Sequence, residues 1–164
     1  MNEQQQAHRL DLTTPSDREI RVERVFDGPR DLVFALYTDP AAIPEWWGPR
    51  AMTTRVETMD VRTGGDWRFR VTTPDGEETV FRGTFREVTA PERIVQTFEW
   101  SGMPGYVSVD TATFEDLGDR TRVVTTSLFH TTQERDGMLG SGMAGGLAET
   151  YERFDELLTR RLAG

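Results

Sequence analysis

The stretch that decides the fold is residues 18–49, REIRVERVFDGPRDLVFALYTDPAAIPEWWGP. Its first part alternates, with Ile20 and Val22 on one face and charged residues on the other, which is the two-residue period of a β-strand. Asp27-Gly28-Pro29 then ends the strand and begins a helix, because proline fits the first helical turn, where its missing N–H costs nothing. The sequence therefore predicts a strand from Arg18 to Phe26 that leads directly into a helix.

Two short helices are expected in the rest of this stretch. Residues 32–37 present an apolar face at helical spacing. Asp39 and Pro40 repeat the start signal, with Asp39 as the N-cap, so a second helix should follow and end by Trp46-Trp47. Adjacent helical residues point in different directions, so one tryptophan should pack inside and the other lie at a rim. The rim residue would be a cavity lip, a partner contact or a plug at the helix end.

The middle of the chain reads as strands throughout. Alternating apolar segments are separated by turn formers such as Pro74-Asp75-Gly76, and they lie near residues 52–60, 66–73, 78–88, 93–100, 106–116 and 120–130. Such short connections predict consecutive hairpins and hence antiparallel pairing. Since strands do not alternate with helices here, a doubly wound parallel sheet is excluded.

The C-terminal segment switches to a helical period. Thr131 and Glu134 have the spacing of a capping box. Residues 137–146 hold five glycines, which favours either a flexible lid or a simple loop. From about Leu147 a strong amphipathic helix is expected, because apolar residues recur at steps of three and four, namely Leu147, Tyr151, Phe154, Leu158 and Leu162. It is the only element long enough to cover the apolar face of the sheet, so the fold class is α+β.

Length and composition limit the alternatives. The 164 residues suit one domain over residues 17–164, preceded by a flexible arm over residues 1–16. With 36% hydrophobic and 29% charged residues, the composition is that of a globular protein. No apolar run reaches membrane-spanning length and the N-terminus lacks a signal-peptide core, so we expect no membrane insertion and a cytoplasmic location.

The residue types exclude several chemistries. Cysteine is absent, which excludes disulfides and thiol nucleophiles and makes a structural zinc site unexpected. Every basic residue is arginine, so Schiff-base chemistry on a lysine is excluded. The net charge of −9 opposes binding of nucleic acid. We expect no cofactor and no metal, because His130 and Glu134 would supply only two ligands.

The order of elements and a set of motifs resemble a known family. The motifs span roughly residues 18–162, and they include Phe26-Asp27-Gly28-Pro29-Arg30-Asp31-Leu32-Val33-Phe34, Trp46-Trp47-Gly48-Pro49, Thr63-Gly64-Gly65, Gly83-Thr84-Phe85-Arg86-Glu87-Val88 and Pro91-Glu92-Arg93-Ile94-Val95. They are similar to the bacterial branch of the START-like (SRPBCC) superfamily that is related to the C-terminal domain of the heat-shock-chaperone ATPase activator (AHSA-like). The resemblance implies a helix-grip fold, in which a curved antiparallel sheet of about seven strands encloses a long C-terminal helix and leaves a hydrophobic cavity. The family often has a tryptophan followed by leucines where this chain has Gly140–Gly146, so a wider cavity mouth is implied.

The candidate ligand-binding residues are aromatic and apolar side chains that alternation or helical spacing would turn toward this cavity. They are Trp47, Trp67, Phe69, Phe81, Phe98, Trp100, Tyr106, Met143, Leu147 and Tyr151. The same side chains would also fill an ordinary core. Polar strand residues have no assigned face without the strand register, and they are Arg70, Arg82, Gln96, Glu99, Asp110, Thr111, Thr113, Thr126 and His130. For each charge among them we expect the outer face.

Three functions follow from these expectations. The first is binding of a small, largely apolar or aromatic ligand in the cavity. The second is a cyclase-like or hydrolase-like enzyme that uses a cavity carboxylate with Tyr106, Tyr151 or His130, although the sequence assigns no catalytic residue. The third is a protein-interaction role with a chaperone partner, implied only by the family resemblance and centred on Trp46-Trp47. An open sheet edge would also allow a homodimer.

Overall fold

Eight antiparallel strands form one curved sheet in the computed structural model, which describes residues 8–164. The strands are β1 (Asp11–Thr13), β2 (Glu19–Phe26), β3 (Thr53–Met59), β4 (Asp66–Thr72), β5 (Glu78–Thr89), β6 (Arg93–Trp100), β7 (Val107–Asp116) and β8 (Thr121–Leu128). Their order across the sheet is β1-β2-β8-β7-β6-β5-β4-β3. The strands from β3 to β8 therefore each pair with the next strand in the sequence. Strand β2 pairs with β8, and β1 pairs with the other side of β2 at the edge of the sheet.

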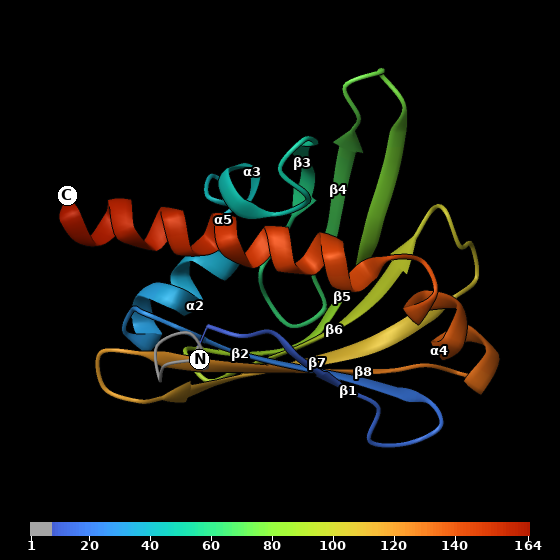
Figure 1. The fold of residues 1–164 in the computed structure, drawn as a ribbon, viewed down its shortest axis with the longest axis horizontal. Helices are drawn as coiled ribbons and strands as arrows, with labels where there is room; N and C mark the ends of the chain where they lie inside the picture. Colours follow the sequence, from blue (N-terminus) through green and yellow to red (C-terminus); the bar gives the residue numbers. More distant parts are fainter. Residues whose placement is uncertain (1–7) are drawn as a thin grey trace.

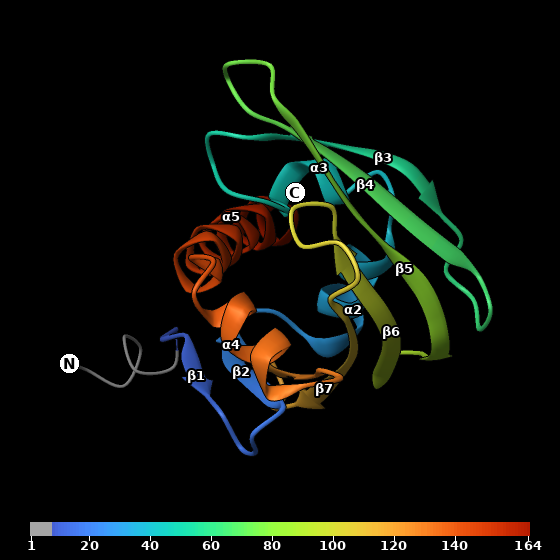
Figure 2. The same cartoon turned by 90° about the vertical axis from the view of Figure 1, so that its right-hand side faces the viewer.

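Four helices in the described range complete the fold. Helices α2 (Arg30–Thr38) and α3 (Ile43–Trp46) follow β2, and α4 (Thr132–Leu139) and α5 (Met143–Ala163) follow β8. Helix α5 crosses the concave side of the sheet (Figure 1). Figure 2, which looks nearly along α5, shows the sheet curving around the space beside this helix. None of the described helices is long and apolar enough to span a bilayer.

Irregular strand pairing accompanies the curvature of the sheet. The register shifts within β3 between Val56 and Thr58, and within β5 between Phe85 and Glu87. Such bulges bend a strand and increase its twist. Gly83 in β5 allows a further close approach, because a Cβ atom there would lie 1.9 Å from the carbonyl oxygen of Thr97.

One end of the concave side is filled by aromatic side chains. Phe154 of α5 contacts Phe26 and Trp46 with ring centroids 4.8 Å apart in both pairs, and Tyr37 at 5.2 Å. The indole N–H of Trp46 donates a hydrogen bond to the carbonyl oxygen of Leu36 at 3.1 Å. The C-terminal half of α5 is thus fixed in a packed core together with α2 and α3.

A buried ion pair also fastens α5 to the sheet. Arg24 of β2 points inward and is only 5% exposed. Its guanidinium donates two hydrogen bonds to the carboxylate of Asp155, at 2.7 and 2.5 Å, and lies 4.8 Å from the ring centre of Phe26. Because the pair is bidentate, it fixes the rotation of α5 about its own axis.

The predicted α+β helix-grip fold and the predicted strands are confirmed, as is the capping box, in which the Thr131 hydroxyl and the Glu134 carboxylate each accept the other residue's backbone N–H. Three details differ from the prediction. Helix α3 begins at Ile43 with Ala42 as its N-cap, and not at Pro40 with Asp39 as its N-cap, because the Asp39 carboxylate accepts the Ala41 backbone N–H in a turn that precedes the helix. The sheet has eight strands, because β1, within the expected arm over residues 1–16, pairs with β2; residues 1–7 of that arm lie outside the described residues. Helix α5 begins at Met143 and not near Leu147, so it includes Gly145 and Gly146.

Candidate functional site

A cavity of about 490 Å³ lies between the concave face of the sheet and the N-terminal half of α5. Its wall includes residues from every strand between β2 and β8 and from all four helices. Gly142 and Gly146 are part of the wall at the start of α5, where they contribute no side chain to fill the space. The cavity therefore occupies the part of the helix–sheet layer that the aromatic core leaves open.

One side of the cavity is aromatic. Trp47 packs edge-to-face on Phe69 and Phe81, with ring centroids 5.1 and 4.9 Å apart. Phe81 stacks on Trp100, whose indole N–H donates a hydrogen bond to the Thr79 hydroxyl at 2.6 Å. These rings hold one another in place, so this part of the wall is a preformed apolar surface.

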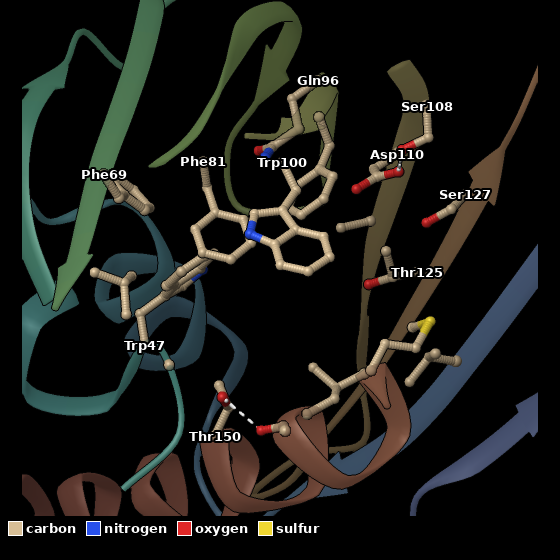
Figure 3. Close-up of a pocket in the computed structure, with 18 of the residues that line it drawn as sticks. Trp47, Phe69, Phe81, Gln96, Trp100, Ser108, Asp110, Thr125, Ser127 and Thr150 are labelled. Carbon is tan, nitrogen blue, oxygen red and sulfur yellow. Dashed lines mark hydrogen bonds between the residues drawn. The ribbon is translucent and has the colours of Figure 1, made fainter. Parts of the chain in front are cut away.

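The two adjacent tryptophans have different surroundings, as predicted, although α3 ends at Trp46 and the Trp47 backbone is extended. Trp46 is 3% exposed and belongs to the packed core. Trp47 is half-buried, and its ring lies on the cavity side of the sheet, against Phe69 and Phe81 (Figure 3). Trp47 therefore forms part of the cavity wall.

Nine of the ten candidate ligand-binding residues line this one cavity, and they are Trp47, Trp67, Phe69, Phe81, Phe98, Trp100, Met143, Leu147 and Tyr151. The tenth, Tyr106, is not part of the cavity wall. It precedes β7 and lies beside Gly137 of α4, where a Cβ atom would be 3.1 Å from the Tyr106 ring. Their role in binding a ligand remains a prediction.

The opposite side of the cavity is polar. Asp110 of β7 stands directly between Gln96 of β6 and Ser127 of β8 in the strand register. Ser108 donates a hydrogen bond to Oδ1 of Asp110 at 2.8 Å, and Thr125 lies two residues from Ser127 on the same face. Figure 3 shows Ser108, Asp110, Thr125 and Ser127 on β7 and β8, across the cavity from Trp47 and Phe69.

This polar group reverses the usual pattern of a strand. In β7, Ser108 and Asp110 face inward, whereas Val107, which is 41% exposed, faces outward. In β8, Ser127 faces inward and Leu128, which is 40% exposed, faces outward. Packing alone favours the opposite arrangement, because buried polar groups are costly and apolar groups gain from burial. Such local conflicts are expected at functional sites.

Burial perturbs the titration of Asp110. Burial raises the pKa of this carboxyl to about 6, against an ordinary value of 3.8, and the Ser127 and Ser108 hydroxyls offset part of the rise because they favour the carboxylate. Among residues 8–164, no arginine or histidine forms an ion pair with Asp110. At neutral pH the cavity therefore contains a carboxylate whose neighbours are neutral.

Two tyrosines complete the polar lining. Burial raises the pKa of both Tyr37 and Tyr151 above the ordinary value of 10, and the nearby Arg24 lowers both to a smaller extent. The Tyr37 hydroxyl has no hydrogen-bond partner in the part of the chain that the structure describes. Both phenols stay protonated at neutral pH, so they can act as hydrogen-bonding groups and not as bases.

The other charged strand candidates lie outside the cavity, as expected for strand charges. Arg82 pairs with Glu99 at 3.0 Å, and Arg70 pairs with Glu78 at 2.7 Å, all outside the cavity wall. His130 is exposed and is not part of the wall, and neither are Thr111, Thr113 and Thr126. Asp110 departs from the expectation of an outward charge. Ser108, Thr125 and Ser127 were not predicted as site residues, although the buried Phe114, four residues after Asp110, indicates which face of β7 is inward.

An antiparallel sheet that grips a C-terminal helix over a cavity defines a START-like, helix-grip protein. Within that class, the chain belongs to the family of Activator of Hsp90 ATPase homolog 1-like (AHSA1) proteins, whose family model matches residues 27–159. No curated protein is significantly similar to the chain in sequence.

Solved structures share this fold over nearly the whole chain. A protein from Rhodobacter sphaeroides is 21% identical with a TM-score of 0.87, and the match covers 93% of this chain and 99% of that one. A protein from Arthrobacter aurescens is 24% identical with a TM-score of 0.84, covering 94% and 92%. The AHSA1 protein from Silicibacter pomeroyi is 19% identical with a TM-score of 0.73, covering 87% and 99%. At these identities the similarity defines the fold and not the ligand.

Proposed function

We propose that this chain is a cytoplasmic binding protein for a small, largely apolar ligand, which it holds in the cavity between the sheet and α5. The observation that carries the proposal is the cavity itself, about 490 Å³ in volume and lined by preformed aromatic rings. Ligand pockets in proteins measure roughly 300–1,000 Å³ and combine an apolar wall with a few polar groups. This cavity fits that description, because Trp47, Phe81 and Trp100 form an apolar wall and the residues around Asp110 supply the polar groups.

Native mass spectrometry of gently purified protein, followed by a thermal-shift screen of apolar and aromatic metabolites, tests this proposal. A co-purifying molecule, or a ligand that raises Tm with its concentration, supports it. Ala112 lines the cavity from the centre of β7, so Ala112→Phe should occupy part of the space and abolish the shift. Thr111→Phe, one residue away and on the outer face, is the matched control that should keep it. Equal shifts in both variants, or none in the unchanged protein across a broad panel, would count against cavity binding.

A second candidate, an enzyme of the cyclase or hydrolase kind, is favoured by Asp110, since a carboxyl whose pKa burial raises to about 6 suits a general base near neutral pH. The co-purified molecule distinguishes the two functions. When it is returned to the protein in large excess and followed by mass spectrometry, a binding protein leaves it unchanged and an enzyme converts it. The Tyr106 and His130 side chains that the enzyme hypothesis included do not reach the cavity wall.

The family description suggests a chaperone partner as a third role, and the surface gives it less support. A docking role centred on Trp46 and Trp47 would need an exposed apolar patch around these residues. Trp46 is buried and Trp47 is packed against Phe69 and Phe81. Among the described residues, the large apolar side chains that are exposed are Val107, Leu128 and Leu162. Leu162 lies next to Arg161, which pairs with Glu45 of α3, but it is a single apolar side chain and not a patch. Co-precipitation with a purified chaperone ATPase tests this role directly.

A further inference from the structure

We propose that the cavity ligand carries a positively charged nitrogen, such as an ammonium group, and that Asp110 is its counter-ion. The inference rests on the proposed function and adds the chemical class of the ligand to it. Its basis is the arrangement of charge and polarity on the inner face of β7 and β8.

The first observation is that Asp110 has acceptor capacity to spare. An ionised carboxylate offers about four lone-pair positions on its two oxygens. The Ser108 hydroxyl takes one of them, on Oδ1, and the Ser127 hydroxyl stands beside the carboxyl in the neighbouring strand. Asp110 is part of the cavity wall. A ligand with N–H donors could therefore reach the carboxylate directly.

The second observation is the charge balance inside the sheet. The other inward charge on the neighbouring strands, Arg24, is already neutralised by two hydrogen bonds to Asp155. The residues beside Asp110 on β6, β7 and β8 are neutral: Ser108 and Ser127 hydrogen-bond to its carboxyl, and Gln96 is its partner in the strand register. Among the described residues, the titratable groups facing it from the helices are Tyr37 and Tyr151, which remain neutral at neutral pH. A cationic ligand would supply the charge that this cavity lacks, whereas an anionic ligand would be repelled.

The third observation is the aromatic wall on the other side of the cavity. Rings of tryptophan and phenylalanine attract cations through their faces and pack well against apolar groups. Trp47, Phe81 and Trp100 form this wall, while Asp110 stands on the opposite one (Figure 3). The shape and polarity therefore suit a ligand with an apolar body and one protonated nitrogen.

Three probes with one aromatic body and different head groups test the inference, and they are 2-(1-naphthyl)ethylamine, 2-(1-naphthyl)ethanol and 1-naphthylacetate. Their affinities are measured by calorimetry at pH 7.5. We expect the amine to bind at least about 10-fold tighter than the alcohol, because hydrogen bonds to charged groups exceed neutral ones in strength, and the acetate to bind most weakly. In Asp110→Asn the amine should lose this advantage, while the alcohol keeps its affinity within about two-fold.

Two controls address structural damage by the substitution. Asp116→Asn makes the same charge change at the exposed end of the same strand and should leave all three affinities unchanged. The unchanged protein supplies the second control, because lowering the pH from 7.5 to 5 protonates Asp110 and should weaken the amine without affecting the alcohol.

The outcomes separate this inference from the proposed function. If the alcohol binds as tightly as the amine, or if Asp110→Asn keeps the preference for the amine, the cationic head group is refuted and the apolar cavity stands. If none of the three probes binds, the proposed function fails and this inference fails with it.

Discussion

Replacing Asp110 by asparagine should stabilise the protein at neutral pH, although the replacement removes a native charge. The asparagine side chain would keep the size of the native one and an oxygen that can accept from Ser108, and it would have no charge to bury. Burial raises the pKa of Asp110 from an ordinary 3.8 to about 6. Since the native state holds the proton more tightly than the unfolded state, the native protein is favoured below about pH 4 and loses this stability as the pH rises through 6.

The size of the effect follows from the same two values. They differ by about 2.2, and each pKa unit corresponds to about 1.4 kcal/mol, so the charged form of Asp110 costs up to about 3 kcal/mol above pH 7. For a chain of this length, that amount corresponds to a rise in Tm of roughly 6–12 °C. The difference between variant and unchanged protein should shrink to nearly zero at pH 4.

Urea unfolding at each pH from 4 to 8 measures the difference, with Asp116→Asn as the control for a general change in net charge. The control should behave like the unchanged protein, because Asp116 is exposed. If Asp110→Asn is less stable at pH 8, or if its advantage is the same at every pH, then the carboxyl is not held in a desolvated cavity and the reasoning is wrong.

Two further pairs of substitutions test the elements that frame the cavity. Asp155→Ala leaves the Arg24 guanidinium buried without its counter-charge and should lower the free energy of unfolding, measured in urea, by about 3 kcal/mol. This value is at the lower end for buried ion pairs because Asp155 is 34% exposed. Glu156→Ala breaks only the exposed pair with Arg50 and should cost less than about 1 kcal/mol, so equal losses would contradict the assigned roles. Gly83→Ala should destabilise the sheet by more than about 2 kcal/mol, since its Cβ would collide with the Thr97 carbonyl. By contrast, the Cβ of Gly145→Ala would meet open space within α5, so this substitution should stabilise the protein by about 0.5–1 kcal/mol. A Gly83→Ala protein with unchanged Tm would refute the close approach of Gly83 to the Thr97 carbonyl.

Local signals in the sequence were sufficient for the secondary structure and the α+β class, whereas the helix-grip arrangement was implied by the family resemblance. Alternation located the strands from β2 to β8, and the Thr131–Glu134 capping box marked the start of α4. The start of α5 was misjudged because intrinsic propensity disfavours helix at Gly145 and Gly146, whereas the packing of α5 in the folded protein cannot be seen in the local sequence. The three-residue β1 is too short to give a periodic signal, and only its pairing with β2 defines it.

The aromatic and polar sides of the cavity differed in how far they could be predicted. Trp67 and Phe69 share a face with Val71, so alternation alone turned them inward. Asp110 could not be placed in this way, since a shift of one residue in register reverses the faces of a strand. Val107 and Val109 favour an outward Asp110, whereas Ala112 and Phe114 in the same strand favour an inward one, and the structure has the second arrangement. Asp110, whose orientation the apolar pattern could not predict, is thus also the residue whose pKa burial raises in the cavity.

Methyl NMR of the methionines offers the most direct test of ligand binding in the cavity. Met52, Met59, Met138 and Met143 line the cavity, whereas the Met103 methyl lies beside Gly137 of α4, outside the cavity wall, and serves as an internal control. The labelled protein is titrated with 2-(1-naphthyl)ethylamine at neutral pH. We predict that signals from the cavity methionines shift along one saturable binding curve while the Met103 signal stays in place. Saturable shifts confined to Met103, or no shift with either the amine or the alcohol, would contradict a ligand-binding cavity between the sheet and α5.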